Sequence, residues 1–308
     1  MITYLYRKLQ HLGLAFVILL LASTAWGKTS LLDHYHRLKN GKSITLPGTH
    51  ISLSSSIQDD ALSAEVSSIV DTPFDAIVAA LSQPDNWCQI MPLHFNIKAC
   101  TYKTQENNAM LTVYSGRKIY EPPEDSYEMT YQFEIISQDD KQFSLRLHAD
   151  EGPVGTSHYL IELDAMPVAE GTLLQIHSSY QPSWFSSLLT STYLSTVGSD
   201  KVGFSRIKQD GELQPVKGIK GVIERNVMRY QIAIDAFLSN KSLPEPSRHE
   251  ATLASWFKQN DSYPQLHEMD ENEYLEIKRE EWSNQKKLQQ ALDDILKLAT
   301  VSYLEEDE

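Results

Sequence analysis

Residues 216–238, VKGIKGVIERNVMRYQIAIDAFL, form the stretch that decides the fold. Apolar side chains recur there at steps of three and four residues, the spacing of one face of an α-helix. These side chains are Ile219, Ile223, Val227, Tyr230, Ile234 and Phe237. Because a helix with so wide an apolar face must be covered, we predict that this segment closes the core of the domain.

Upstream of this helix the chain alternates apolar and polar residues, which is typical of half-buried strands. The alternation is clearest in residues 127–135, YEMTYQFEI. Short turns separate the runs, so consecutive strands should pair antiparallel. We predict an α+β fold with helices near 73–81 and 86–91 and seven strands near 65–70, 95–102, 110–119, 127–135, 143–148, 159–163 and 174–180.

The histidines are not expected to form a site. Three of them occupy the polar phase of the predicted strands and should face solvent: His148, His158 and His177. Three others lie in a polar leader, residues 28–62, that has no clear period and no further metal-ligand cluster. We expect these to be solvated as well: His34, His36 and His50.

The order of these elements and the segment AEVSSIVDTPFDAIVAALSQPDNW, residues 64–87, resemble the helix-grip superfamily of START-like and polyketide-cyclase-like proteins (SRPBCC). The resemblance covers about residues 65–238. It implies a curved sheet wrapped on the last helix, with an elongated apolar pocket between them. Members mostly bind lipids, sterols or other hydrophobic small molecules, and a minority are enzymes. LHFNIKAC, GPVGT and ERNVMRY also look like segments of an exported bacterial subgroup.

The first 27 residues have the pattern of a signal peptide, with Arg7 and Lys8 before an apolar run and a cleavage site after Gly27. An uncleaved membrane anchor is the alternative, although no stop-transfer pattern follows. We therefore expect a periplasmic or secreted protein with no stable membrane insertion after cleavage. The two cysteines, Cys88 and Cys100, suit a disulfide in such a compartment. Neither spacing nor neighbours support a metal site or a redox pair.

The charge argues against some partners. The formal net charge is −14, and a chain this acidic would be repelled by nucleic acid and by anionic lipid headgroups. The excess is greatest after residue 244, where sixteen acidic residues face seven basic ones.

Residues 241–308 are predicted to be a helical, acidic extension of the 63–240 domain. An apolar stripe runs through its last helix, formed by Leu288, Leu292, Ile295 and Ala299. The extension either packs back on the domain or presents a helix for a protein partner or a second copy.

The aromatic phase of the strands is the predicted ligand site. Apolar walls with a few hydroxyl groups are the usual composition of a small-molecule pocket, and the alternative is a packed core without a cavity. The predicted ligand-binding residues are Tyr127, Tyr131, Phe133, Tyr159, Tyr180, Arg117, Arg225, Arg229 and Tyr230. For Arg225 and Arg229 a structural ion network is the favoured alternative. His94 and Lys98 are further polar candidates.

No motif for catalysis, phosphate binding, cofactors or metals is present. The leading hypothesis is an exported, non-catalytic binding protein for a lipid-like or other hydrophobic small molecule. The second is an interaction protein that acts through the C-terminal helices. The third is a cyclase- or hydrolase-type enzyme, which would need a cavity-lining acid or base with a shifted pKa.

Overall fold

The computed structural model describes residues 30–40, 51–105, 108–183, 202–209 and 211–306. The predicted signal peptide and its cut after Gly27 lie outside the described residues. His50 also lies outside them, as does most of the apolar connector between residues 182 and 204.

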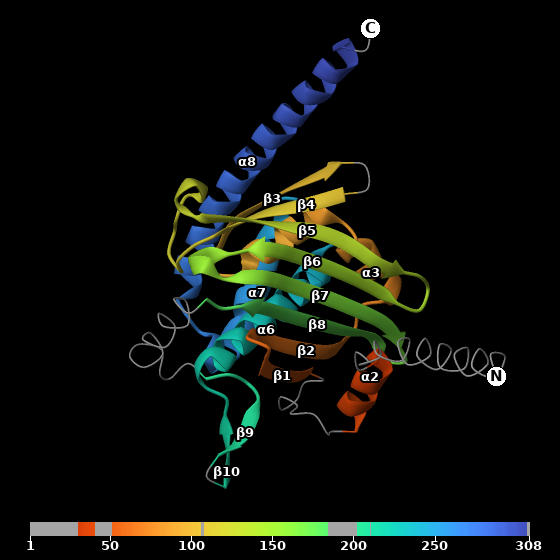
Figure 1. Ribbon diagram of the computed structural model, residues 1–308, viewed down its shortest axis with the longest axis vertical. Helices are drawn as coiled ribbons and strands as arrows, with labels where there is room; N and C mark the ends of the chain where they lie inside the picture. The colour runs from red at the N-terminus through yellow and green to blue at the C-terminus, as the bar shows by residue number, and fades with distance from the viewer. Residues whose placement is uncertain (1–29, 41–50, 106–107, 184–201, 210, 307–308) are drawn as a thin grey trace, which may run out of the picture.

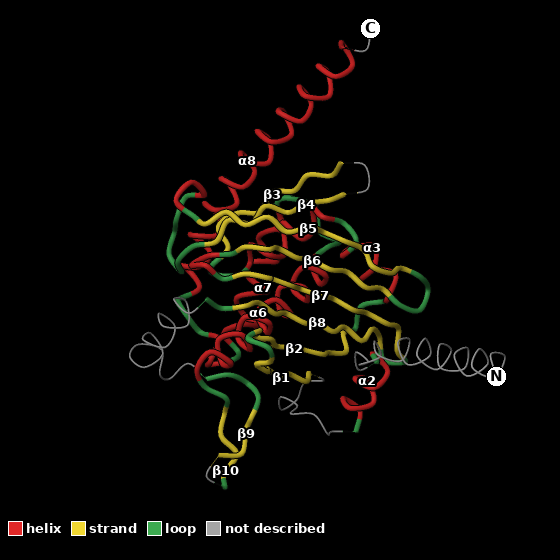
Figure 2. The backbone as a smooth tube through the Cα atoms, viewed as in Figure 1, coloured by secondary structure: helices red, strands yellow, loops and turns green. Residues whose placement is uncertain are grey.

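An antiparallel sheet of eight strands, in the order β1-β2-β8-β7-β6-β5-β4-β3, dominates the fold (Figures 1 and 2). Each strand pairs antiparallel with its neighbour, and the register shifts once in each of the β3–β4, β5–β6 and β7–β8 pairs. The sequence predicted seven strands, and the additional one is β1. The strands are β1 (Ile51–Gln58), β2 (Ala61–Val70), β3 (Ile97–Gln105), β4 (Asn108–Ser115), β5 (Tyr127–Gln138), β6 (Phe143–Glu151), β7 (Ser157–Val168) and β8 (Gly171–Gln181).

One face of the sheet packs against the long helix α6 (Gly218–Asn240), the helix predicted from its apolar stripe. Ile223, Val227 and Ile234 of that stripe are at most 2% exposed, and each fully buried side chain of this kind stabilises the fold by about 1.5–3 kcal/mol. Two short helices, α3 (Phe74–Leu81) and α4 (Pro84–Ile90), join β2 to β3. This arrangement is the helix-grip fold that the sequence resemblance implied.

The leader contains regular structure, although its sequence has no clear period. Its helix α2 (Leu31–Lys39) lies against β2, β7 and β8, and β1 adds the eighth strand beside β2. His34 projects from the inner side of α2 and is 6% exposed, so the expectation of a solvated His34 is wrong. His36 lies two residues further along and therefore on the opposite side of α2, and it is exposed as expected.

The C-terminal extension forms part of the same hydrophobic core. It comprises α7 (Ser247–Asp261), a short 3-10 helix (η4, Pro264–Leu266) and α8 (Glu271–Glu306). Trp256 and Tyr274 are fully buried and pack on Phe95, with ring centroids 5.0 and 5.5 Å away. The extension therefore packs back on the domain over its first half, while the last turns of α8 extend beyond the sheet (Figure 1).

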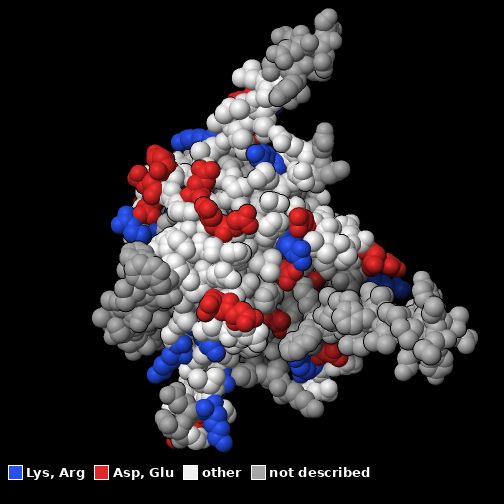
Figure 3. All heavy atoms as spheres, in the orientation of Figure 1, with Lys and Arg blue, Asp and Glu red and all other residues white. Residues whose placement is uncertain are grey.

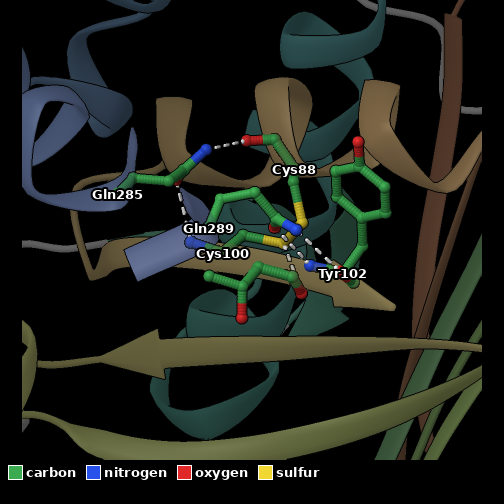
Figure 4. Close-up of a disulfide and its surroundings, with 6 residues drawn as sticks. Cys88, Cys100, Tyr102, Gln285 and Gln289 are labelled. Atoms are coloured by element: carbon green, nitrogen blue, oxygen red, sulfur yellow. Dashed lines mark hydrogen bonds between the residues drawn. A yellow bond between two sulfur atoms is a disulfide. The ribbon is translucent and has the colours of Figure 1, made fainter. Parts of the chain in front are cut away.

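Cys88 of α4 and Cys100 of β3 form a disulfide, as predicted (Figure 4). Gln285 of α8 lies beside it and bonds to the backbone of both cysteines. A hairpin that the sequence did not predict, β9 (Arg206–Gln209) with β10 (Glu212–Pro215), precedes α6. Among the described residues, no helix has the length and hydropathy needed to span a membrane.

Candidate functional site

Four of the predicted tyrosines meet between the sheet and α6, each from a different element. They are Tyr131 of β5, Tyr159 of β7, Tyr180 of β8 and Tyr230 of α6. The rings of Tyr159 and Tyr180 stack with centroids 5.2 Å apart and 9° between their planes. Burial raises the pKa of Tyr131 well above its ordinary value, and the nearby Tyr230 and Tyr159 raise it further. The phenols are therefore neutral at physiological pH.

The loop before β7 fixes the position of Tyr159. The hydroxyls of Thr156 and Tyr159 are 2.8 Å apart, and Thr156 donates to the Pro153 carbonyl at 2.6 Å. The Tyr159 ring also packs directly on Gly152. A Cβ atom at residue 152 would lie 2.1 Å from that ring, so only glycine fits there. This loop is the GPVGT segment quoted above.

The other three hydroxyls differ from that of Tyr159. Those of Tyr131, Tyr180 and Tyr230 form no hydrogen bond with any other residue that the structure describes, although burial raises the pKa of each. We call Tyr131, Tyr159, Tyr180 and Tyr230 the tyrosine cluster. The hydroxyls of the three residues other than Tyr159 can donate hydrogen bonds to a bound molecule and accept hydrogen bonds from it.

Of the remaining predicted residues, Phe133 adjoins this cluster, whereas Tyr127 and Arg117 lie at the surface. Phe133 is 7% exposed on the inward phase of β5, next to Tyr131 along the strand. Tyr127 has the same phase but begins the strand and is 39% exposed. Arg117 follows the end of β4, where its side chain is 76% exposed and pairs with Glu121.

Arg229 of α6 is buried and has partners within the protein. Its guanidinium donates to Glu268 at 2.8 Å and to the Leu266 carbonyl at 3.1 Å, and it lies 5.4 Å from the centre of the Phe95 ring. Desolvation lowers its pKa to about 10, so it stays charged at neutral pH. Glu268 also pairs with Lys118 at 2.7 Å. Arg229 thus joins α6 to the C-terminal extension.

The neighbouring charges on α6 bind the loop that leads into β9. Glu224 accepts hydrogen bonds from the backbone N–H groups of Phe204 and Ser205, at 2.7 and 2.9 Å. Arg225 donates to the Val202 carbonyl at 3.3 Å. Successive helical residues point about 100° apart, so these charges project from a different side of α6 than Tyr230.

His94 and Lys98 are both buried, but in different surroundings. The His94 ring stacks on that of Tyr230 with centroids 5.5 Å apart. Burial, followed by the charges of Arg229 and Lys118, lowers its pKa well below the usual value, so the ring is neutral. Lys98 instead pairs with Glu281 of α8 at 2.9 Å. His94 is therefore a titratable group that directly contacts the tyrosine cluster.

A pocket of about 480 Å³ lies on the other face of the sheet, beneath α2. His34, Glu65, Gln175 and His177 are among its lining residues. The His34 ring lies 3.1 Å from Glu65 and 3.0 Å from the Gln175 amide, and desolvation with the charge of Arg37 lowers its pKa to about 4. Among the described residues, no group of three or more His, Cys, Asp or Glu is arranged to hold a metal ion.

A second surface pocket, of about 290 Å³, lies where α8 leaves the body of the protein. We call it the root pocket. It lies between the loop that precedes β5 and one side of α8, and its lining residues are Tyr120, Pro122, Pro123, Glu124, Asn284, Lys287, Leu288 and Ala291.

Together, the strand order and the helix packed on one face of the sheet define a helix-grip fold. No protein-family model matches the chain, and no curated protein matches it at a significant level.

Similar solved structures include a STAR-related lipid transfer protein from Xanthomonas axonopodis, with 11% identity, 63% of this chain and 96% of that chain covered, and a TM-score of 0.38. Human StAR-related lipid transfer protein 5 has 8% identity, coverage of 62% and 90%, and a TM-score of 0.32. CalU16 from Micromonospora echinospora has 12% identity, coverage of 72% and 99%, and a TM-score of 0.30. Because these superpositions are loose, the assignment of the fold rests on the topology itself.

Proposed function

We propose that this protein is an exported, non-catalytic binding protein that holds a lipid-like or other hydrophobic small molecule between the sheet and α6. The observation that carries the proposal is the tyrosine cluster. Its rings come from four different elements and meet in an apolar, aromatic surrounding, where burial raises the pKa of each phenol. A molecule with an apolar body and one polar group would satisfy both parts of this surface.

In this proposal the walls of the site are Tyr131, Phe133, Tyr159, Tyr180 and Tyr230. The raised pKa values of the tyrosines keep the hydroxyls neutral, so they favour an uncharged polar group such as a hydroxyl or a carbonyl. Burying an anion beside unpaired neutral phenols would cost its desolvation.

The predicted arginines have other roles in the proposal. The contacts of Arg225 and Arg229 within the protein favour the structural network for both residues. Tyr127 and Arg117, which are exposed, would lie outside the enclosed part of the site.

Export is part of the proposal. The signal-like pattern of residues 1–27 and the Cys88–Cys100 disulfide both suit an oxidising compartment such as the periplasm.

The test is to purify the protein from its host without detergent and to analyse an organic extract by mass spectrometry. We expect a hydrophobic compound in stoichiometric amount, reduced in Tyr131→Trp, where the larger ring fills the site, and in Tyr230→Phe, which removes only a hydroxyl. Tyr35→Phe, on the exposed side of α2, is the matched control and should retain the compound. The proposal would be wrong if the extract contains no such compound and the protein does not bind the fluorescent probe anilinonaphthalene sulfonate.

A further inference from the structure

The side of α8 that lines the root pocket continues along the part of the helix that extends beyond the body. Leu288 and Ala291 line the pocket. Ile295 follows Leu288 by seven residues, and Leu298 follows Ala291 by the same number. Seven residues are about two helical turns, so Ile295 and Leu298 project from the same side of α8. Ile295 is 63% exposed and Leu298 71% exposed. One side of α8 thus carries a pocket at its root and an exposed apolar ridge further along.

The body of the protein supports α8 only over its first half. Buried contacts of the helix extend as far as Gln285 and Gln289, which bond to the backbone of β3. The helix continues to Glu306. In proteins most of the stability of a helix comes from packing of its apolar face rather than from helix propensity. In Figure 3 the described part of this projecting segment presents mainly uncharged atoms. These features indicate that the ridge is covered in the working state of the protein.

The charges on the same side of α8 complement each other. Lys287 is at the root, and Asp294 follows it by two turns along the same edge of the ridge. When two identical helices pair antiparallel, the same edge of each helix meets. Lys287 of one copy would then face Asp294 of the other, and the two-fold axis repeats the pair. Within one copy Asp294 lies 3.9 Å from Lys297 and accepts from Gln290 at 2.9 Å, both at the exposed surface of α8, so a facing Lys287 would add a further contact to it.

The sizes of the side chains agree with such a crossing. Ala291 lies close to the midpoint between Lys287 and Asp294, where a small side chain lets two helices approach closely. The same register brings Ile295 of one copy over the root pocket of the other, beside Pro122 and Pro123.

We propose that the protein forms a two-fold dimer in which the projecting half of α8 packs antiparallel on α8 of a second copy, with Ile295 and Leu298 at the partner's root pocket. A second copy fits better than an anionic membrane, because the net charge is −14 and acidic groups are spread over the face of the sheet seen in Figure 3. A second copy also fits better than an unrelated protein, because the same side of α8 carries both the root pocket and the exposed ridge that would fill it.

The first experiment is sedimentation equilibrium of the purified protein over a range of concentrations. We expect a monomer–dimer equilibrium that I295D/L298D weakens by about tenfold or more. A protein that stays monomeric up to about 100 μM would overturn the proposal. So would a monomer that co-floats with vesicles of phosphatidylcholine and phosphatidylglycerol.

A charge exchange tests the antiparallel register directly. K287E places two acidic groups opposite each other twice in the dimer, and D294K places two basic groups opposite each other, so each variant alone should dimerise at least about tenfold more weakly. An equimolar mixture of the two should form a heterodimer in which both pairs are attractive, and K287E/D294K should dimerise like the wild type.

K286E, one residue away and pointing off this side of α8, is the matched control and should not change the equilibrium. Failure of the mixture to associate, with both single variants folded, would overturn the antiparallel arrangement.

Discussion

Gln289 of α8 and Tyr102 of β3 form a reciprocal pair of hydrogen bonds. The Tyr102 N–H donates to Gln289 Oε1 at 2.9 Å, and Gln289 Nε2 donates to the Tyr102 carbonyl at 3.0 Å. One helical turn earlier, Gln285 Oε1 accepts from the Cys100 N–H at 2.8 Å, and Gln285 Nε2 donates to the Cys88 carbonyl at 2.7 Å (Figure 4). β3 is the last strand of the sheet on this side.

The spacing explains how a helix can pair with a strand edge. Residues two apart in a strand are separated by about 6.6 Å, and residues four apart in a helix by about 6 Å. The two glutamines therefore reach the outward-facing backbone groups of Cys100 and Tyr102. An uncovered edge strand is a template for aggregation, so α8 protects this edge as well as covering the core.

Replacing Gln285 should test this contact most directly. Gln285→Ala leaves the buried Cys100 N–H and Cys88 carbonyl without this partner, which should lower the free energy of unfolding by about 1–3 kcal/mol. Gln289→Ala should cost less, because its site is only half-buried. Chemical denaturation measures both. Gln290→Ala, on the exposed side of the same turn, is the control and should change stability by less than about 0.5 kcal/mol. Equal effects at residues 285 and 290 would contradict the edge-covering role.

The disulfide should contribute to stability in a measurable way. Cys88 and Cys100 are 12 residues apart in sequence, and closing a loop of this size stabilises a fold by about 3 kcal/mol in the chain-entropy model. Reduction should therefore lower the guanidinium midpoint of the wild type. The double variant Cys88→Ala/Cys100→Ala should start from a lower midpoint and should not respond to reductant. A wild-type midpoint unaffected by full reduction would show that the bridge contributes little.

The buried ion pair of Arg229 should matter far more than an exposed pair of the same kind. Glu268→Gln leaves the Arg229 guanidinium, 2% exposed, without its carboxylate, at an expected cost of about 3–5 kcal/mol. Glu250→Gln removes the partner of Arg279, where both side chains are about half exposed, and should cost less than about 1 kcal/mol. Thermal or chemical unfolding distinguishes the two. Similar, small losses would mean that Arg229 does not depend on Glu268.

The sequence was sufficient to predict the helices and strands in which apolar side chains recur with a clear period. The apolar stripe of α6 and the alternation of β5 predicted both elements, because burial imposes a period on side-chain type. In β5 the predicted phase is buried at Met129, Tyr131 and Phe133, whereas Ile135 is 43% exposed where the register with β6 shifts. β1 was missed because its sequence, ISLSSSIQ, has serine on both faces of the strand, which obscures the alternation of Ile51 and Leu53.

The prediction of the candidate site depended on where each strand ends. The phase of β5 correctly places Tyr131 inward, but phase alone cannot show that Tyr127 begins the strand and is exposed. In the same way, Arg117 lies beyond the end of β4. The burial of Lys98 could not be predicted, since its partner Glu281 is 183 residues away and a polar pair leaves no period in the sequence.

Lys278 makes the stability of the protein depend on pH in a particular direction. Its ammonium is buried and donates to Glu281 at 2.7 Å and to the carbonyls of His94 and Ile97 at 2.9 Å each. Desolvation lowers its pKa to about 8 in the folded protein, against about 10.4 in an unfolded chain. Between these values the unfolded state binds more protons, so the free energy of unfolding should rise with pH from about 8 upward. Chemical denaturation at several values between pH 7.5 and 9.5 measures this rise.

Keeping the measurements below pH 9.5 avoids an opposing effect of the tyrosines on the free energy of unfolding. Burial raises the pKa of Tyr131 and Tyr230, so the folded state retains their protons above pH 10 and loses stability there. Lys278→Met should be less stable at its best pH, because three acceptors lose a donor, and its stability should no longer rise between pH 7.5 and 9.5. Lys286→Met changes an exposed lysine of the same helix and should keep the wild-type rise. An identical pH slope in Lys278→Met and the wild type would mean that Lys278 keeps an ordinary pKa in the folded protein, despite its burial.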